Sequence, residues 1–395
     1  MALTAAQRRS SPSESLGGKN SNEYEVRNAI DSGYRYYVNS LSKSELQETR
    51  DCVEIELTQF MRDQSTYLLS ISPELQPVSS ALSSFLLDSG KRLRPLFAYA
   101  GIKSTGGSLT PATTKAISCL ELLQACALIH DDLMDGSDTR RGKPSIHRHF
   151  ESIHVQDALE GFAPAYGLAS AVLLGDLALV WSNQLLNTSG ISADELRRVM
   201  PIFDEMRVEL MAGQFLDIHE QTQKNTDLDR SMKIARYKSG KYTIERPLHM
   251  GAVLAADASP ALLAALSDYG LPLGEAFQFR DDLLGVFGDP SVTGKPAGDD
   301  LREGKRTALI AMTDAKCTDA MKAESRKYFG KNDIDDKGVA ILQEMIVSTG
   351  AKAALETMID ELTSKALKAI ENPVIDNAGR DLLNELALIA TKRSM

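Results

Sequence analysis

The stretch from Ala116 to Asp135 constrains the fold of this chain most strongly. It is apolar for most of its length and contains neither glycine nor proline, so it predicts a buried helix. It ends in three carboxylates, Asp131, Asp132 and Asp135. On a helix, Asp131 and Asp135 would lie one turn and about 40° apart, and Gln124 would lie about 20° from Asp131. The chemistry of the chain is therefore expected on one stripe of this helix.

Carboxylates at this end of a helix need a stabilising partner. Like charges on one helical face repel one another, and the macrodipole is already negative at a helix C-terminus. An acidic end exposed to solvent is the structural alternative. Mg²⁺ is the natural partner, because it takes carboxylate oxygens and shares them with substrate phosphates. A metal site is favoured if a second acidic group exists elsewhere.

A second apolar helix with the same ending supplies that group. The sequence from Phe277 to Asp289 carries the pair Asp281 and Asp282, and Asp217 is a third candidate ligand. Two such helix ends facing each other would hold several Mg²⁺ ions between them. Together they indicate phosphate chemistry that depends on Mg²⁺.

The basic residues agree with this hypothesis. Lys and Arg number 44 against 54 Asp and Glu, a net charge of −10 that argues against nucleic-acid binding. A single basic run is ordinarily a solvated surface, but four clusters beside Gly or Pro in an acidic chain indicate diphosphate binding. They occupy 90–95, 140–144, 237–241 and 294–306.

Composition and periodicity predict the organisation. Residues 1–22 are rich in Ser, Gly and Asn and are expected to be a disordered N-terminal extension, whereas 23–395 has helical periodicity and no alternation long enough for a sheet. We predict an all-α, single-domain helical bundle with core helices around a central cavity. Expected helices include 167–186, 193–221, 227–236, 241–257 and 260–287, with a loop from 136 to 150.

Cysteine usage and hydropathy bear on location. The four cysteines are scattered without metal-ligand spacing, which favours reduced thiols in the cytoplasm. Neither a signal peptide nor an apolar run long enough to span a bilayer is visible. We therefore expect a cytoplasmic protein without stable membrane insertion.

The ordered motifs resemble the trans-isoprenyl diphosphate synthases, and most closely the geranylgeranyl diphosphate synthases. They cover roughly 85–310 and read GKRLRP (90–95), ELLQACALIHDDLMD (121–135), TRRGKP (139–144), GQFLD (213–217), YKS (237–239), FQFRDDLLGVFGD (277–289) and GKPAGDDLREGK (294–305). The resemblance implies the isoprenoid synthase fold for 23–395, three Mg²⁺ ions per active site and a homodimer.

The resemblance also implies a role for each matching residue. Isopentenyl diphosphate would be bound by Lys91, Arg94, Gln124 and Arg141. The allylic diphosphate would be bound by Arg140, Lys238, Lys295 and Lys305. The Mg²⁺ ligands would be Asp131, Asp135, Asp217, Asp281 and Asp282. Ser239, where the family usually has Thr, and Gln278 would line the site of the allylic cation. The catalytic set would be Asp131, Asp135, Lys238, Gln278 and Asp281.

The implied reaction is electrophilic prenyl transfer. The allylic carbon–oxygen bond ionises as charge on the leaving diphosphate is neutralised, and isopentenyl diphosphate attacks the cation. The released pyrophosphate takes the proton, so no protein nucleophile is required. A class I terpene cyclase shares the first Asp motif, but it would need neither GKRLRP nor Gln124.

One position departs from the family pattern. The second Asp motif normally has a third Asp where this chain has Gly285. Ligation on that side would rest on Asp281 and Asp282, with either Asp289 or Asp300 as an addition. The substitution leaves open a second interpretation, in which the chain is a non-catalytic partner subunit of another synthase.

Chain length is the last inference from the sequence. The growing hydrocarbon would run from Asp131 toward the helix N-terminus, past Ala127 and then Leu123 and Leu120. Cys126 and Ala127 are small, whereas farnesyl-making relatives have an aromatic residue at one or both positions. We therefore expect geranylgeranyl diphosphate as product, with farnesyl or longer chains as alternatives. Alternatively, the small residues only allow close helix packing.

Overall fold

The computed structural model describes residues 44–88, 90–223, 225–290, 297–331 and 333–391. From Ser44 onward the chain forms one compact unit. The predicted disordered extension, residues 1–22, lies outside the described residues, as does Lys295. The boundary between residues 22 and 23 stays a prediction.

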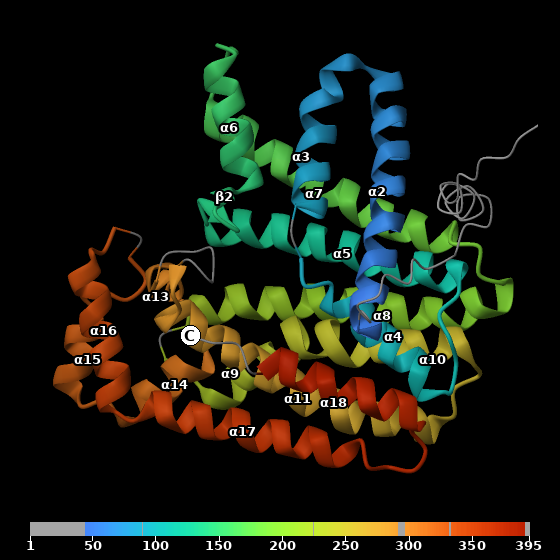
Figure 1. Ribbon diagram of the computed structural model, residues 1–395. Coiled ribbons are helices and arrows are strands. Elements are labelled where there is room, and N and C mark those ends of the chain that lie inside the picture. The colour runs from blue at the N-terminus through green and yellow to red at the C-terminus, as the bar shows by residue number, and fades with distance from the viewer. Residues whose placement is uncertain (1–43, 89, 224, 291–296, 332, 392–395) are drawn as a thin grey trace, which may run out of the picture. The chain divides into compact units, whose positions relative to one another are not determined.

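The described chain is almost entirely helical, which confirms the all-α prediction (Figure 1). The α-helices are α2 (Glu45–Ile71), α3 (Gln76–Leu87), α4 (Leu93–Ser104), α5 (Pro111–Asp135), α6 (Ile146–Gln156), α7 (Ala163–Asn187), α8 (Ala193–Gln221), α9 (Leu228–Ile234), α10 (Arg246–Ala255), α11 (Pro260–Phe287), α13 (Asp299–Glu303), α14 (Ala308–Lys316), α15 (Asp319–Ser325), α16 (Asp336–Ser348), α17 (Ala351–Ala369) and α18 (Asn377–Thr391). A 3₁₀ turn, η1 (Pro73–Leu75), precedes α3, and a π-helix, η2 (Ala235–Glu245), joins α9 to α10.

Local signals define the ends of the helix that carries the first Asp motif. Thr110 caps α5 reciprocally with Thr113, and Pro111 takes the first helical position. Gly136 follows the last turn with φ 69°, the left-handed conformation that commonly ends a helix. The helix between these signals buries more than half of its side chains and packs along α7.

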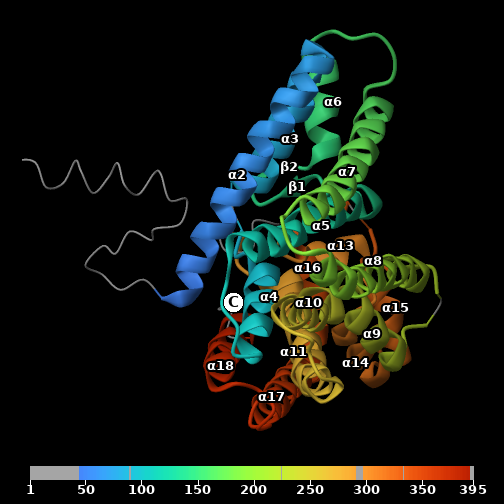
Figure 2. The ribbon, with the colours of Figure 1, turned by 90° about the vertical axis from the view of Figure 1, so that its right-hand side faces the viewer.

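The remaining packing places the other motif-bearing elements around this helix. The π-helix η2 packs against both α8 and α11, α4 packs against α10, and α11 also packs against α17. Figure 2 shows α8, α10 and α11 in the same part of the molecule, with α5 next to α4. One large apolar cluster joins α2–α8, α10, the first half of α11 and α18, and a smaller one joins the end of α11 to α13, α14, α16 and α17.

Two local predictions were wrong. The expected loop 136–150 contains a two-residue hairpin, β1 (Thr139–Arg140) with β2 (Lys143–Pro144), and α6 begins already at Ile146. The expected break near 237–240 does not exist, because helix continues from α9 through η2 into α10. The polar and glycine-rich composition of both segments is typical of loops, and packing against neighbouring helices overrides it.

The prediction that no apolar run is long enough to span a bilayer was also wrong by length and composition. Among the described residues, α5 and α7 are long and apolar enough to cross a membrane by length and composition. The apolar window of α5 is 72% buried inside the protein, so it is a core helix. The window of α7 is only 33% buried, which leaves an apolar face on the surface.

Candidate active site

Two lysines join the acidic residues that the sequence singled out. The Nζ atom of Lys238 on η2 lies 3.0 Å from Oδ1 of Asp131 and 2.6 Å from Oδ2 of Asp217. The Nζ atom of Lys305 lies 2.8 Å from Oδ2 of Asp135. Residues of α5, α8, η2 and the segment after α13 therefore meet in one site.

The charges in this site stabilise one another. Burial alone would raise the pKa of Asp131, but Lys238, Lys305 and Arg140 lower it below its ordinary value. Burial raises the pKa of Asp135, and the charge of Asp131 adds to this effect. Burial opposes protonation of both lysines, yet the surrounding carboxylates raise their pKa values. Asp131 is therefore ionised and both lysines are protonated at neutral pH.

Arg140 lies on the same side of the site. Its Nε atom donates to Asp132 at 2.9 Å, and its Nη2 atom lies 3.5 Å from Asp131. Asp132, to which the sequence assigned no role, is 1% exposed and orients this guanidinium. Arg140 ends β1, and the hairpin then turns through Arg141 (φ 54°) and Gly142 (φ 73°). Two positive φ angles are typical of a type I′ turn.

The second Asp motif approaches the first through α8. Gln278 donates to Asp282 at 2.8 Å, and Asp282 is 4% exposed. Burial raises the pKa of Asp282 well above its usual value, and the charges of Asp300, Asp281 and Asp217 contribute in the same direction. Asp217 therefore contacts the first group through Lys238, and its charge acts on Asp282 of the second.

Close approach of two helices positions Lys238. A Cβ atom at Gly213 of α8 would overlap the backbone nitrogen of Lys238 and lie 2.7 Å from its Cα. Only glycine lets the π-helix pack at this distance. The next residue, Gln214, donates to Oδ1 of Asp131 at 3.0 Å. The sequence analysis missed Gln214, although it stands inside the GQFLD motif.

The residues expected to bind isopentenyl diphosphate are only partly brought together. Arg94 donates to Thr243 at 2.8 Å, and its guanidinium carbon lies 4.2 Å from the centroid of the Tyr242 ring. The hydroxyl of Tyr242 donates to Gln124 at 2.7 Å. Arg94 and Gln124 thus lie on either side of one tyrosine, which the sequence did not identify. Lys91 is exposed in the loop before α4.

Arg92 fixes this loop from inside. It has a left-handed backbone with φ 50° and is 4% exposed. Its guanidinium lies 2.8 Å from both Glu54 and Glu121 and donates to the carbonyl of Leu86 at 2.7 Å. An arginine in this conformation is strained and persists only where its surroundings hold it. Arg92 therefore positions its neighbour Lys91 rather than facing a ligand itself.

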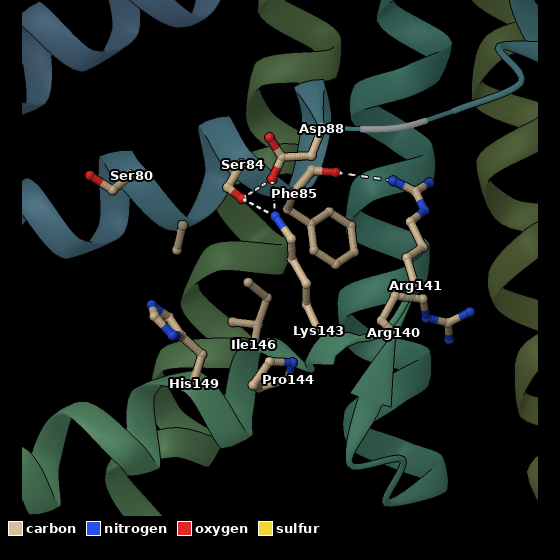
Figure 3. Close-up of a pocket in the computed structure, with 11 residues that line it drawn as sticks. Ser80, Ser84, Phe85, Asp88, Arg140, Arg141, Lys143, Pro144, Ile146 and His149 are labelled. Carbon is tan, nitrogen blue, oxygen red and sulfur yellow. Dashed lines mark hydrogen bonds and ion pairs between the residues drawn. The ribbon is translucent and has the colours of Figure 1, made fainter. Parts of the chain in front are cut away.

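A cavity of about 660 Å³ opens between α3, the hairpin and α6 (Figure 3). Arg140 and Arg141 both contribute to its lining. Arg141 donates to the carbonyl of Phe85 at 3.3 Å, and Lys143 lies 2.5 Å from Asp88. The hairpin is therefore attached to the end of α3, which holds the two arginines at the edge of the site.

The predicted chain-length residues differ in their surroundings. Leu123 and Cys126 are fully buried. The Sγ atom of Cys126 lies 3.8 Å from Nδ1 of His130. Burial, together with the charge of Asp176 on α7, raises the pKa of the Cys126 thiol to about 12. Ala127 is only partly buried, like Gln124 and Asp131 on the same helix. Cys126 thus faces α7, whereas Ala127 lies on the accessible stripe below the carboxylates.

The remaining expectations concern one lining residue and the metal. Ser239 is partly buried next to Lys238 on η2. In the part of the chain that the structure describes, no three His, Cys, Asp or Glu side chains are arranged to hold a metal ion by themselves. Ammonium groups instead separate the carboxylates.

Comparison with known proteins identifies the family. The polyprenyl synthetase family matches residues 76–346. A geranylfarnesyl diphosphate synthase of Aeropyrum pernix is 30% identical over 80% of this chain and 94% of its own length. A farnesyl diphosphate synthase of Geobacillus stearothermophilus is 31% identical over 69% of this chain and 88% of its own length.

A solved structure agrees with these relatives. A geranylgeranyl pyrophosphate synthase of Corynebacterium glutamicum, complexed with isoprenyl diphosphate and magnesium, matches with a TM-score of 0.85 and 40% identity. The match covers 89% of this chain and all of that one. The helical fold, the ordered motifs and these matches lead to one conclusion: the chain belongs to the polyprenyl synthetase family, as a trans-prenyltransferase with the isoprenoid synthase fold.

Proposed function

We propose that this protein is a Mg²⁺-dependent prenyltransferase that condenses isopentenyl diphosphate with allylic diphosphates to make geranylgeranyl diphosphate. The observation that carries this proposal is the group of carboxylates from the ends of α5 and α8, in which Lys238 joins Asp131 to Asp217 and Lys305 contacts Asp135. The Corynebacterium glutamicum synthase, which binds isoprenyl diphosphate and magnesium, supports the choice of ligand. The relatives differ in product length, so the geranylgeranyl product is the finer part of the proposal.

The residues present fit Mg²⁺ bound together with a diphosphate. Mg²⁺ is usually held by one or two carboxylates and completes its shell with phosphate oxygens and water. Asp131 and Asp135 would hold it on one side, Asp281 and Asp282 on the other, with Asp217 between them; the expected number is three ions. Carboxylates in small groups separated by lysines suit such shared ligation. When bound, the metal would supply Lewis-acid stabilisation of the leaving diphosphate.

The chain's own cations would share this work. Arg140, Lys238 and Lys305 are protonated and lie among the carboxylates, so their charges would help to bind an allylic diphosphate. Lys295 would join them. Gln278, Ser239 and the end of α8 would surround the cation that remains after the carbon–oxygen bond ionises.

A second group of residues would hold isopentenyl diphosphate against the cation. Arg94 and Gln124 converge on Tyr242. Lys91, which precedes the strained residue Arg92, and Arg141, which is itself strained, would complete this group. Fixing both reactants in one site makes the attack effectively intramolecular. A terpene cyclase would need no such second site.

The direct test is a product assay. The full-length chain is incubated with Mg²⁺, isopentenyl diphosphate and, separately, dimethylallyl, geranyl or farnesyl diphosphate, and the products are sized by chromatography. We expect geranylgeranyl diphosphate from each primer and no product after EDTA is added. Absence of condensation with every primer would overturn the proposal in favour of a non-catalytic partner subunit, and a cyclic hydrocarbon would favour a terpene cyclase.

Lys91→Ala should weaken binding of one substrate only. Loss of a charge-assisted hydrogen bond to a diphosphate corresponds to a rise in KM of roughly 10- to 100-fold. We expect this rise for isopentenyl diphosphate and little change for the allylic partner, as measured by steady-state kinetics. Equal rises for both substrates would contradict the assignment of Lys91, and Lys103→Ala, in the last turn of α4, serves as the control.

We also propose that the protein is a cytoplasmic homodimer. Large apolar side chains are exposed on α7 and α8, among them Leu173 (65%), Val180 (60%), Val208 (69%) and Phe215 (66%). An apolar surface of this kind is typical of an interaction site. A second copy of the chain would cover it and remove the need for membrane insertion.

Leu173→Glu is expected to shift the protein from dimer to monomer, because a buried unpaired carboxylate at an interface is strongly unfavourable. Sedimentation equilibrium measures the mass. The matched control is Ile55→Glu on α2, a side chain that is 66% exposed. A Leu173→Glu protein with the same mass as wild type would show that this face is not the dimer interface.

A further inference from the structure

The carboxylate of Asp300 occupies the space beside Gly285. A Cβ atom built on Gly285 would overlap Oδ2 of Asp300 and would lie 2.5 Å from its Cγ and 3.0 Å from its Oδ1. No side chain of any length can therefore replace Gly285 unless Asp300 moves. The position at which relatives were expected to carry a third Asp is filled by a carboxylate from another part of the chain.

The short helix α13 holds Asp300 at this place. Leu301 is fully buried, and its carbonyl accepts from Gly330 at 2.9 Å. The backbone nitrogen of Lys305 donates to the carbonyl of Asp300 at 3.0 Å. On the other side of α13, Ser137 donates to Glu303 at 2.6 Å, which ties the helix to the end of α5. Packing against α11 completes this attachment.

The surroundings of Asp300 are those of the proposed metal site. Its carboxylate is 16% exposed and lies 3.7 Å from Nζ of Lys305, which also contacts Asp135 of the first motif. In the second motif it lies beside Gly285. Asp300 therefore adjoins both groups of proposed ligands.

We propose that Asp300 acts as the third carboxylate of the second Asp motif, supplied from α13 in place of the residue missing at 285. The inference rests on the proposed Mg²⁺-dependent function and adds a ligand to it. Asp289, the other candidate from the sequence, is exposed beyond the end of α11. The loss of one carboxylate from α11 is thus compensated through space, and the chain keeps the charge of a complete motif.

The experiment moves the carboxylate between the two positions. Five variants are compared with wild type: Asp300→Asn, Asp299→Asn, Gly285→Asp, the double variant Gly285→Asp/Asp300→Ala, and Asp131→Asn. Mn²⁺ serves as the metal probe in the presence of inorganic pyrophosphate, and electron paramagnetic resonance of free Mn²⁺ gives the number and affinity of bound ions. Thermal unfolding without metal reports on the fold.

We expect Asp300→Asn to weaken binding of at least one Mn²⁺ ion by about 10- to 100-fold, whereas the neighbouring Asp299→Asn binds as wild type. Gly285→Asp alone should lower Tm by about 2–6 °C, because its side chain and Asp300 compete for one space. The double variant should recover Mn²⁺ affinity and the Tm of the wild type. If Asp300 only stabilised the fold, moving the carboxylate from position 300 to position 285 would not restore the Mn²⁺ affinity.

Two outcomes would overturn the inference. One is wild-type Mn²⁺ binding by Asp300→Asn, and the other is a Gly285→Asp protein that gains affinity without loss of Tm. Asp131→Asn shows whether a negative result concerns only the role of Asp300 or the proposed metal site as a whole. If Asp131→Asn weakens Mn²⁺ binding and Asp300→Asn does not, only the role of Asp300 is wrong. If neither variant changes binding, the proposed metal site itself is wrong.

Discussion

Replacing Asp131 with asparagine should lower kcat by about 10²–10³-fold, the loss typical of removing one group that stabilises developing charge. The carboxylate of Asp131 lies at the centre of the site, in contact with Lys238, Gln214 and Arg140. Asparagine has the same shape and can still accept a hydrogen bond, so the packing of α5 should not change. Steady-state kinetics at saturating Mg²⁺ measures the loss.

The matched control for this variant is Asp138→Asn. Asp138 follows the same helix, but its side chain is 70% exposed and pairs with Arg148 at the surface. An exposed pair of this kind contributes little to stability, so both activity and Tm should stay at wild-type values. Turnover of Asp131→Asn close to wild type, with an unchanged Tm, would remove Asp131 from the catalytic set.

The second large effect concerns the product. Ala127→Phe should shorten the product from geranylgeranyl to farnesyl diphosphate while the first condensation continues. Ala127 is partly buried on the same stripe of α5 as Asp131 and Gln124, so a phenyl ring there would extend into the path of the growing hydrocarbon. Chromatography of the products formed from dimethylallyl diphosphate measures the change. Ala127→Ser, which adds one polar atom, should keep the full-length product.

Cys126→Phe is expected to act differently. Cys126 is fully buried and faces His130 and α7, so the ring would overpack a filled space at a cost of about 1–3 kcal/mol. A lower Tm should therefore accompany any change of product, which is not expected for Ala127→Phe. If both variants still make the full-length product, the hydrocarbon does not pass this part of α5 and the chain-length prediction is wrong.

Much of the fold could be predicted because local signals agreed with periodicity. Helices α8 and α11 begin and end at the predicted residues, 193–221 and 260–287. Ser192 caps α8 with Glu195, and Ser259 caps α11 just before Pro260. Helix caps, proline positions and a 3.6-residue apolar pattern depend on residues that are neighbours in the sequence. The ends of such helices can therefore be predicted from the sequence. The family followed from the same kind of information, as ordered motifs.

Long-range packing decided the segments that were predicted wrongly. The run 237–240 is polar and contains a glycine, and an isolated chain of this composition favours a turn. It forms a π-helix because α8 and α11 pack against it and Gly213 admits its backbone. The hairpin at 139–144 likewise lies against the end of α3, where Arg141 contacts Phe85 and Lys143 contacts Asp88. Neither partner lies near in the sequence.

Residue type and helical period are local properties, so the charged side chains and the helix stripes that present them could be read from the sequence. Which of these charges meet depends on long-range packing. Lys238 joins Asp131 to Asp217, and Lys305 joins Asp135 to Asp300, across separations of tens to hundreds of residues. The missing carboxylate at Gly285 could be read from the sequence, which offered both Asp289 and Asp300 as additions. Only the packing shows that Asp300 is the one beside Gly285. The position of a carboxylate in space depends on how α13 packs against α11, and no local pattern records that packing.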